Sequence, residues 1–259
     1  MKPLALALLV ALAAPAAAQS DAAAVVERGR DLVTAGYFAN SPDTLLAARA
    51  TLGVAAQADD PVVAAWAAYY AALADHRLAS VFWGGNPARA VAHAEGGAAA
   101  LAPVVERAGL PDALRAEAYA LHAALLSAQM GIDPGRAGRL GPASQASTQA
   151  SVRLAPDNPR VLFQRASSLL MTPAEWGGDP AEGARLLERS TGLFGAAPDG
   201  LAPAWGEDEA WAWLGLAHLM AGDAAAARPA IERAEALHPA SPFVQYKLKP
   251  WLAQVESAR

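Results

Sequence analysis

The chain has 259 residues, of which 70 are alanine, and it carries a formal net charge of −5. Ile occurs twice, Thr six times and Cys never, so the composition favours helices over sheets and excludes disulfides, thiol nucleophiles and Cys-ligated metals. The acidic balance argues against nucleic acid as a partner, because proteins that bind nucleic acid usually carry a basic face.

Residues 1–18 are typical of a secretory signal peptide. Met1-Lys2 is a short basic start, residues 4–14 are apolar, and Ala16-Ala17-Ala18 provides an A-x-A cleavage site. The apolar run is too short for a spanning helix, and no later stretch reaches about 18 uncharged apolar residues. We therefore expect cleavage after Ala18 by a bacterial Sec-type route, a periplasmic or secreted mature chain and no membrane span. The alternative is a short N-terminal anchor.

The remaining chain shows helical periodicity from end to end. Helices are predicted over 21–36, 42–57, 61–79, 87–108, 111–130, 135–154, 159–171, 180–194, 208–221, 224–237 and 241–254. The breaks contain Pro, Asn, Asp and Gly, and many place Pro at the first helical position after a capping residue. Helices of this length with short loops predict antiparallel hairpins.

The clearest hairpin runs from Asp208 to Ser241. Its spacing matches the 34-residue pattern W-x2-L-G-x2-Y, then A-x3-F, then P. The residues that carry the match are Trp211, Leu214, Gly215, His218, Ala227, Ile231 and Pro239. The chain therefore resembles the tetratricopeptide repeat (TPR) superfamily, and it is similar to secreted bacterial TPR-like proteins with Gly-Gly loops. The resemblance implies an all-α, right-handed α-α superhelix of helical hairpins.

Two further units support the repeat. Residues 159–194 form one with a longer turn, and residues 83–88 echo residues 176–181 at an offset of 93. The upstream copy is looser, because the small position of the repeat is not kept there. We expect four parts: the signal peptide at 1–18, an N-terminal hairpin at 19–60, the repeat array at 61–241 and a capping helix at 242–259, which Pro250 should end or kink.

The resemblance also implies a binding surface. In TPR proteins the first helix of each hairpin lines a concave groove that binds extended peptides or partner segments. Transfer by position predicts a groove surface of Tyr70, Arg77, Arg160, Phe163, Gln164, Glu209, Trp213 and Leu216, with Ser167 and Met220 beside them. Aromatic anchors with Arg are typical of recognition surfaces. The alternative for each residue is packing against a neighbouring helix.

Motifs for chemistry are absent. The five histidines lack metal-ligand spacing, and the chain has no H-E-x-x-H, phosphate-binding loop or G-x-S-x-G. The two Trp-Gly-Gly loops are interpreted as helix starts, with ligand contact as the alternative. The acidic run 207–209 is interpreted in the same way, with a cation site as the alternative. Residues 135–141, rich in Gly and Arg, predict a solvated helix segment, with an anion site as the alternative.

Two function classes remain, and neither requires a cofactor or a metal. The first is an exported, non-catalytic scaffold that docks a protein or peptide partner in the concave groove. The second is a periplasmic small-ligand-binding protein associated with a transporter, suggested by the seven tryptophans, because apolar pockets use aromatic walls. An open continuous groove would favour the scaffold, and a tryptophan-lined cavity with converging polar groups would favour the ligand. A deep pocket with two close carboxylates would favour an enzyme.

Overall fold

The computed structural model describes the backbone of residues 7–195 and 200–257, and side chains from residue 21 onward within those ranges. These residues form eleven α-helices and no strands. The helices are α1 (Ala7–Phe38), α2 (Pro42–Ala55), α3 (Pro61–Phe82), α4 (Pro87–Glu106), α5 (Asp112–Ile132), α6 (Ala137–Leu154), α7 (Pro159–Met171), α8 (Pro180–Thr191), α9 (Glu207–Met220), α10 (Ala224–Leu237) and α11 (Lys249–Ser257). The predicted all-α fold of helical hairpins is confirmed.

The helix starts follow the predicted capping chemistry. Asp60 accepts a hydrogen bond from the backbone N–H of Val62 at 2.8 Å, and Asp179 accepts one from that of Glu182 at 2.9 Å. Each cap is followed by proline, which supplies a helical φ without wasting an N–H donor. The Trp-Gly-Gly loop before α8 also needs its glycines, since Gly177 has a φ of +92°.

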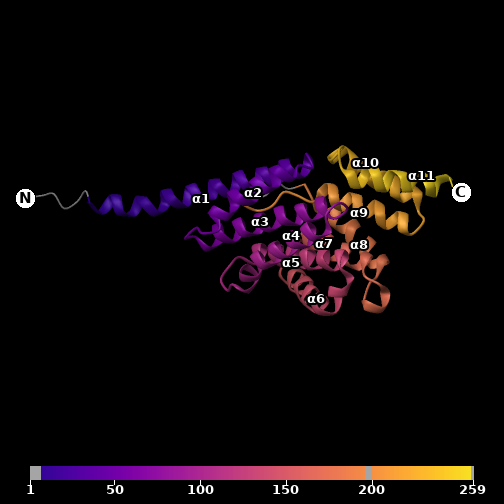
Figure 1. The fold of residues 1–259 in the computed structure, drawn as a ribbon, viewed down its shortest axis with the longest axis horizontal. Helices are drawn as coiled ribbons and strands as arrows, with labels where there is room; N and C mark the ends of the chain where they lie inside the picture. Colours follow the sequence, from indigo (N-terminus) through magenta and orange to yellow (C-terminus); the bar gives the residue numbers. More distant parts are fainter. Residues whose placement is uncertain (1–6, 196–199, 258–259) are drawn as a thin grey trace, which may run out of the picture.

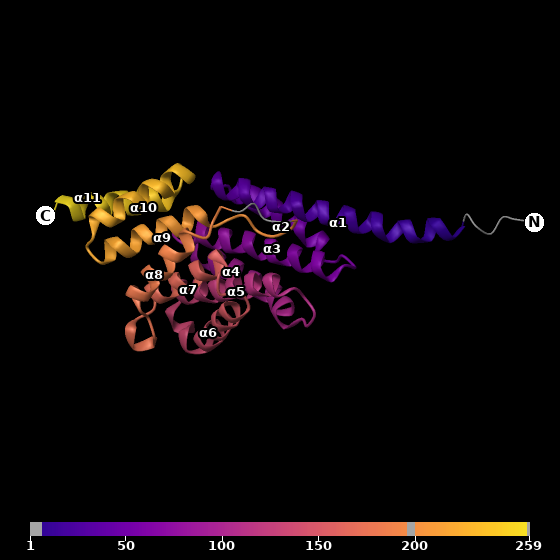
Figure 2. The same cartoon turned by 180° about the vertical axis from the view of Figure 1, so that it is seen from behind.

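The hairpins stack in chain order, as Figure 1 shows. Helices α1 to α5 share one apolar core, whereas α9, α10 and α11 enclose another at the C-terminal end. Gly215 illustrates why the predicted repeat needs a small residue: a Cβ there would lie 2.6 Å from Cγ1 of Ile231 on α10. Figure 2 shows from behind that the start of α1 and the end of α11 point to opposite ends of the described structure.

The two ends of the chain differ in detail from the sequence prediction. Helix α1 is continuous from Ala7, so the backbone around the predicted cleavage site is helical, and residues 1–6 lie outside the described part. At the other end, Pro250 does not end the last helix. A π-helical segment, η3 (Val244–Leu248), precedes it and continues into α11. Pro250 has no backbone N–H to donate. The wider π-helical turn before it accommodates the carbonyl that would otherwise have accepted that hydrogen bond.

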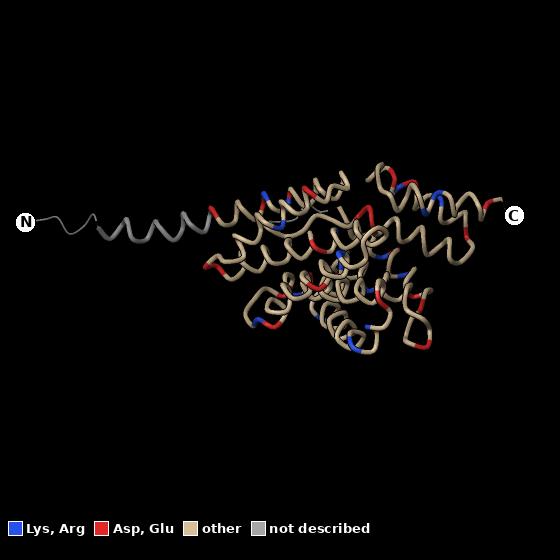
Figure 3. The backbone as a smooth tube through the Cα atoms, in the orientation of Figure 1, with Lys and Arg blue, Asp and Glu red and all other residues tan. Residues whose placement is uncertain are grey.

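No described helix is long and apolar enough to cross a membrane. Figure 3 shows that acidic and basic positions are interspersed along the described helices.

Candidate functional site

The structure divides the predicted groove surface between two places. Tyr70 and Arg160 lie under the connection between α8 and α9, while Arg77, Glu209 and Trp213 line a cleft further along the molecule. The other three are Phe163, which is buried against Trp213 with ring centroids 6.3 Å apart, Leu216, which packs on the C-terminal core, and Gln164, which is partly buried on α7.

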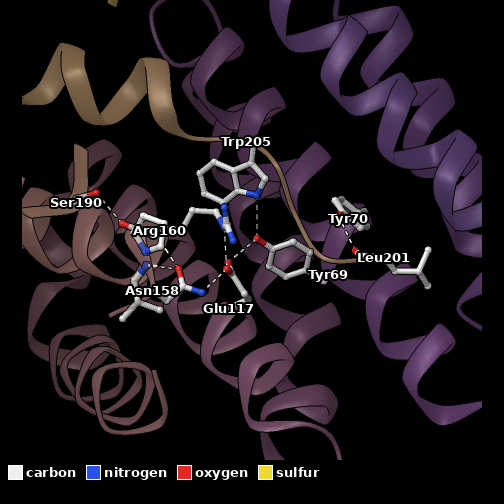
Figure 4. Close-up of polar contacts among 10 residues, drawn as sticks. Tyr69, Tyr70, Glu117, Asn158, Arg160, Ser190, Leu201 and Trp205 are labelled. Atoms are coloured by element: carbon white, nitrogen blue, oxygen red, sulfur yellow. Dashed lines mark hydrogen bonds and ion pairs between the residues drawn. The ribbon is translucent and has the colours of Figure 1, made fainter. Parts of the chain in front are cut away.

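Residues 200–206 of this connection, here termed the strap, run back across α1 and α3. Arg30 donates a hydrogen bond to the carbonyl of Gly200 at 3.0 Å, and the Tyr70 hydroxyl donates one to that of Leu201 at 2.8 Å. Figure 4 shows the strap lying over both tyrosines of α3. The strap thus covers the face from which the sequence predicted peptide binding.

A buried polar network holds the end of the strap in place. Glu117 of α5, 2% exposed, accepts bonds from Asn158 and from Arg160, each at 2.7 Å, and from the Tyr69 hydroxyl at 3.1 Å. The Tyr69 oxygen in turn accepts from the indole N–H of Trp205 at 2.9 Å (Figure 4). Burial acts to lower the pKa of Arg160, but the adjoining carboxylate outweighs it and raises that pKa. The network is internally satisfied and is a structural element.

The second place, here termed the junction cleft, has a volume of about 410 Å³. It lies where α1, α2 and α3 face α9, α10 and η3. Its lining comprises Gly36, Tyr37, Asn40, Leu45, Arg77, Ser80, Val81, Asp208, Glu209, Ala212, Trp213, Ala234, His238, Ser241, Pro242, Phe243 and Val244. This size and this mixture of aromatic, aliphatic and charged groups are typical of small-molecule sites.

Arg77 and Glu209 join the two walls of the cleft. The guanidinium donates from Nη1 and Nη2 to the two carboxylate oxygens of Glu209, each at 2.5 Å. Its carbon also lies 4.2 Å from the ring centroid of Tyr37 and 5.0 Å from that of Trp205. Burial acts to lower the pKa of Arg77, but Glu209 outweighs it and raises that pKa, so the ion pair stays charged.

Asp208 is the centre of a second bridge. One of its oxygens accepts a hydrogen bond from the Tyr37 hydroxyl at 2.6 Å and lies 3.2 Å from Nδ1 of His238. The other ring nitrogen of His238 faces the carbonyl of Phe38 at 3.4 Å. Burial, and secondarily the charge of Glu209, raises the pKa of Asp208 above 3.8, and the same two causes raise the pKa of Tyr37 well above 10.

The carboxylates of the cleft are already engaged by other side chains. Asp208 and Glu209 are two close carboxylates, the feature that would favour an enzyme. However, Arg77 engages both oxygens of Glu209, and one oxygen of Asp208 is bonded to Tyr37 and lies beside His238, so the two carboxylates are held by separate partners. Among the described residues, no group of three or more His, Asp or Glu side chains could hold a metal ion.

Sequence reasoning named Arg77, Glu209 and Trp213 but missed Tyr37, Asp208, His238 and Phe243 as cleft residues. Asp208 carried a signal, because the acidic run 207–209 left a cation site open. Tyr37 and His238 carried none, since they are 201 positions apart and only the return of α10 to the end of α1 brings their rings to 4.9 Å. The His218 and Pro239 positions of the repeat pattern gave no indication of this contact.

The fold is that of an all-α helical hairpin protein, and a cleft lies where its first three helices face α9, α10 and η3. No family model and no curated protein matches the chain. Among solved structures it is similar to the HusA haemophore from Porphyromonas gingivalis, with 26% sequence identity and a TM-score of 0.57. The match covers 74% of this chain and 91% of the haemophore. That neighbour is a binding protein, as its name states.

Proposed function

We propose that the chain is an exported, non-catalytic TPR-like binding protein that holds a small organic ligand in the junction cleft. The observation that carries the proposal is the construction of the cleft. Its walls come from opposite ends of the chain, and they are joined by side chains, Arg77 to Glu209 and Tyr37 to Asp208, rather than by interlocked helices. The space between them, about 410 Å³, is large enough for a small organic molecule.

The comparison with a haemophore supports small-ligand binding over protein docking. The concave face offers less support for the scaffold hypothesis, because Tyr70 and Arg160 of the predicted groove surface are covered by the strap. A partner peptide would have to displace the strap. We expect a synthetic peptide of the strap sequence, Gly-Leu-Ala-Pro-Ala-Trp-Gly, to show no binding by calorimetry; saturable binding would reinstate groove docking.

Haem, the ligand that the neighbour's name implies, is the first specific candidate. Haem iron takes His or Tyr ligands, and His238 and Tyr37 both line the cleft. Their polar atoms are already engaged by Asp208, and burial keeps the Tyr37 phenol protonated. The propionates would also meet two carboxylates, while Arg77 is held by Glu209. The cleft as described does not fit haem.

The proposal is tested with N-phenyl-1-naphthylamine, an uncharged apolar dye that fluoresces when it is bound. Ser80 is exposed on α3 and lines the cleft, so Ser80→Trp places an indole in the ligand space. The matched control is Thr34→Trp, since both hydroxyls are exposed on helices and bond the carbonyl four residues back, but Thr34 does not line the cleft.

We expect saturable one-to-one dye binding by the wild-type chain and by Thr34→Trp, and a loss of about tenfold or more in affinity for Ser80→Trp. Equal binding by all three proteins would show that the cleft is not the site. Absence of saturable binding to the wild type would overturn the proposal. A parallel haem titration, followed by its visible absorbance, should show no dependence on Ser80→Trp; a dependence would make haem the ligand.

A further inference from the structure

The lining of the junction cleft contains two carboxylates, Asp208 and Glu209, but one guanidinium, that of Arg77. The side chains of Asp208 and Glu209 enter from α9, and Arg77 enters from α3. The guanidinium of Arg77 is paired with Glu209, because it donates two hydrogen bonds of 2.5 Å, one to each oxygen of that carboxylate. A bidentate pair of this kind is geometrically complete. Asp208 therefore forms no ion pair with Arg77, the arginine of α3 that lines the cleft.

Asp208 itself is only half satisfied. Its Oδ2 accepts the Tyr37 hydroxyl at 2.6 Å and lies 3.2 Å from the His238 ring, whereas its Oδ1 accepts no hydrogen bond from the described residues. The side chain is 11% exposed. Because most of this side chain is buried, water hydrates the carboxylate only in part, and a donor that a ligand brings to Oδ1 would stabilise it. The raised pKa of Asp208, caused first by burial, reflects the same cost.

The apolar walls have the electronic character that suits a cation. Trp213 and Phe243 line the cleft with ring centroids 6.1 Å apart, and Tyr37 lies on the opposite wall. Aromatic faces attract organic cations through their quadrupoles. The cleft already shows this preference internally, since the Arg77 guanidinium lies 4.2 Å from the ring centroid of Tyr37. An anionic ligand would meet carboxylates and aromatic faces in the cleft, because the guanidinium of Arg77 is already paired with Glu209.

We propose that the ligand of the junction cleft is an organic cation, an amine with an apolar body, whose ammonium group bonds the free oxygen of Asp208 while its body lies against Trp213 and Phe243. This inference rests on the proposed function, and it separates the chain from its haemophore neighbour in ligand charge. It also gives the acidic run 207–209 a role beyond opening α9.

The test uses three probes that share one ring system and differ in charge: 1-naphthylmethylammonium, 1-naphthylmethanol and 1-naphthoate. Each is titrated by calorimetry into the full chain at pH 8, where histidine side chains are ordinarily neutral. The variant is Asp208→Asn, which keeps the shape of the side chain and removes its charge. The matched control is Glu207→Gln, the adjacent acidic residue, which is bonded to Arg233 at 2.8 Å and does not line the cleft.

We expect the ammonium probe to bind about tenfold or more tightly than the alcohol, and the naphthoate to bind most weakly. Asp208→Asn should remove most of that preference while alcohol binding stays within about twofold, and Glu207→Gln should bind as the wild type does. Circular dichroism and thermal melts establish that both variants are folded.

The outcomes separate the inference from the proposed function. If the alcohol or the naphthoate binds as tightly as the ammonium, or if Asp208→Asn keeps the preference for the ammonium, the cleft is a ligand site but the cationic inference is wrong. If none of the three probes binds and the naphthylamine dye also fails, the proposed function falls and the inference falls with it. If only the dye binds, the cationic inference alone is overturned.

Discussion

The strap-covered face and the junction cleft are built from the same kinds of residue but are closed in different ways. Over the first, a segment of the chain itself lies on α3, and Trp205 completes a network in which the Glu117 side chain is 3% exposed. In the second, only side chains cross between the walls, and Glu209 at the centre is 16% exposed. The first is therefore already covered by the protein itself, whereas the second encloses a cavity, in which we propose that a ligand binds.

This difference shows that an aromatic and Arg composition does not by itself identify a free binding surface. Arg160 and Arg77 both form ion pairs with glutamate, at 2.7 and 2.5 Å. What separates them is the access of water to the partner carboxylate, which decides how much each pair contributes to folding and how readily it can yield to a ligand. Four variants test this comparison.

Glu117→Ala should have the largest effect. It leaves the Arg160 guanidinium charged and unpaired, and it also removes the acceptor of Asn158 and Tyr69. We expect a loss of about 3–5 kcal/mol in the free energy of unfolding, measured by urea denaturation. Glu188→Ala, at an exposed position of α8, is the control and should change stability by less than about 0.5 kcal/mol. A loss below about 1 kcal/mol for Glu117→Ala would contradict the structural role of the network.

Arg77→Ala should cost less, although its ion pair is the shorter of the two. Removal of the guanidinium leaves Glu209 unpaired, but this carboxylate lies in the open cleft and can be rehydrated. We expect a loss of about 1–3 kcal/mol by the same denaturation measurement. Arg77→Lys should recover part of the loss by restoring one charge without the bidentate geometry. If Arg77→Ala cost as much as Glu117→Ala, the cleft would be closed core rather than a binding site.

Trp205→Phe tests how firmly the strap is held. The substitution keeps an aromatic ring packed against the core, but it removes the N–H that bonds the Tyr69 oxygen and part of the ring that faces Arg77. A single hydrogen bond of this kind contributes about 1 kcal/mol and the smaller ring adds a packing cost, so we expect a loss of about 1–2 kcal/mol in unfolding free energy. Trp176→Phe, at a position that is 66% exposed, is the control and should be nearly neutral. An equal effect of the two substitutions would mean that the indole bond does not hold the strap.

Much of the fold could be predicted from the sequence, because its signals are local. Capping residues followed by proline marked the starts of α3, α7 and α8, and apolar periodicity marked the helix bodies. Gly215 matched the small position of the repeat pattern, which spans a single hairpin, and the structure places it against Ile231 of the same hairpin. Residues within one hairpin are near in sequence, so their spacing encodes their contact.

The candidate site was predicted only in part, because its contacts are distant in sequence. The position of Glu209 in the repeat placed it on the inner face of its hairpin, but its pairing with Arg77 spans 132 residues. The strap carried no helical or repeat signal, so nothing in its sequence showed that it would return to cover Tyr70. The pairing of Arg77 with Glu209 and the covering of Tyr70 by the strap both depend on how the hairpins stack. The repeat pattern does not extend over the whole chain, so the sequence does not specify that stacking.

Asp208→Asn should have the smallest effect on stability, and its sign depends on pH. Because burial and Glu209 raise the pKa of Asp208 in the folded state, the folded chain holds a proton over a pH range in which the unfolded chain has released it. Wild-type stability therefore falls as pH rises from 3.8 through the raised folded value, and the cost is present in full above that value. Asparagine has no such titration.

We therefore expect the unfolding free energy of Asp208→Asn, relative to wild type, to be more favourable at pH 7 than at pH 4, by less than about 1 kcal/mol. Urea denaturation at the two pH values measures the change, and Glu207→Gln corrects for the loss of one acidic charge from the same turn of α9. A relative stability that moved in the opposite direction would mean that the Tyr37 hydroxyl and His238 over-compensate the carboxylate. The ligand-free cleft would then hold a satisfied anion, and a cationic ligand would have little charge left to bind.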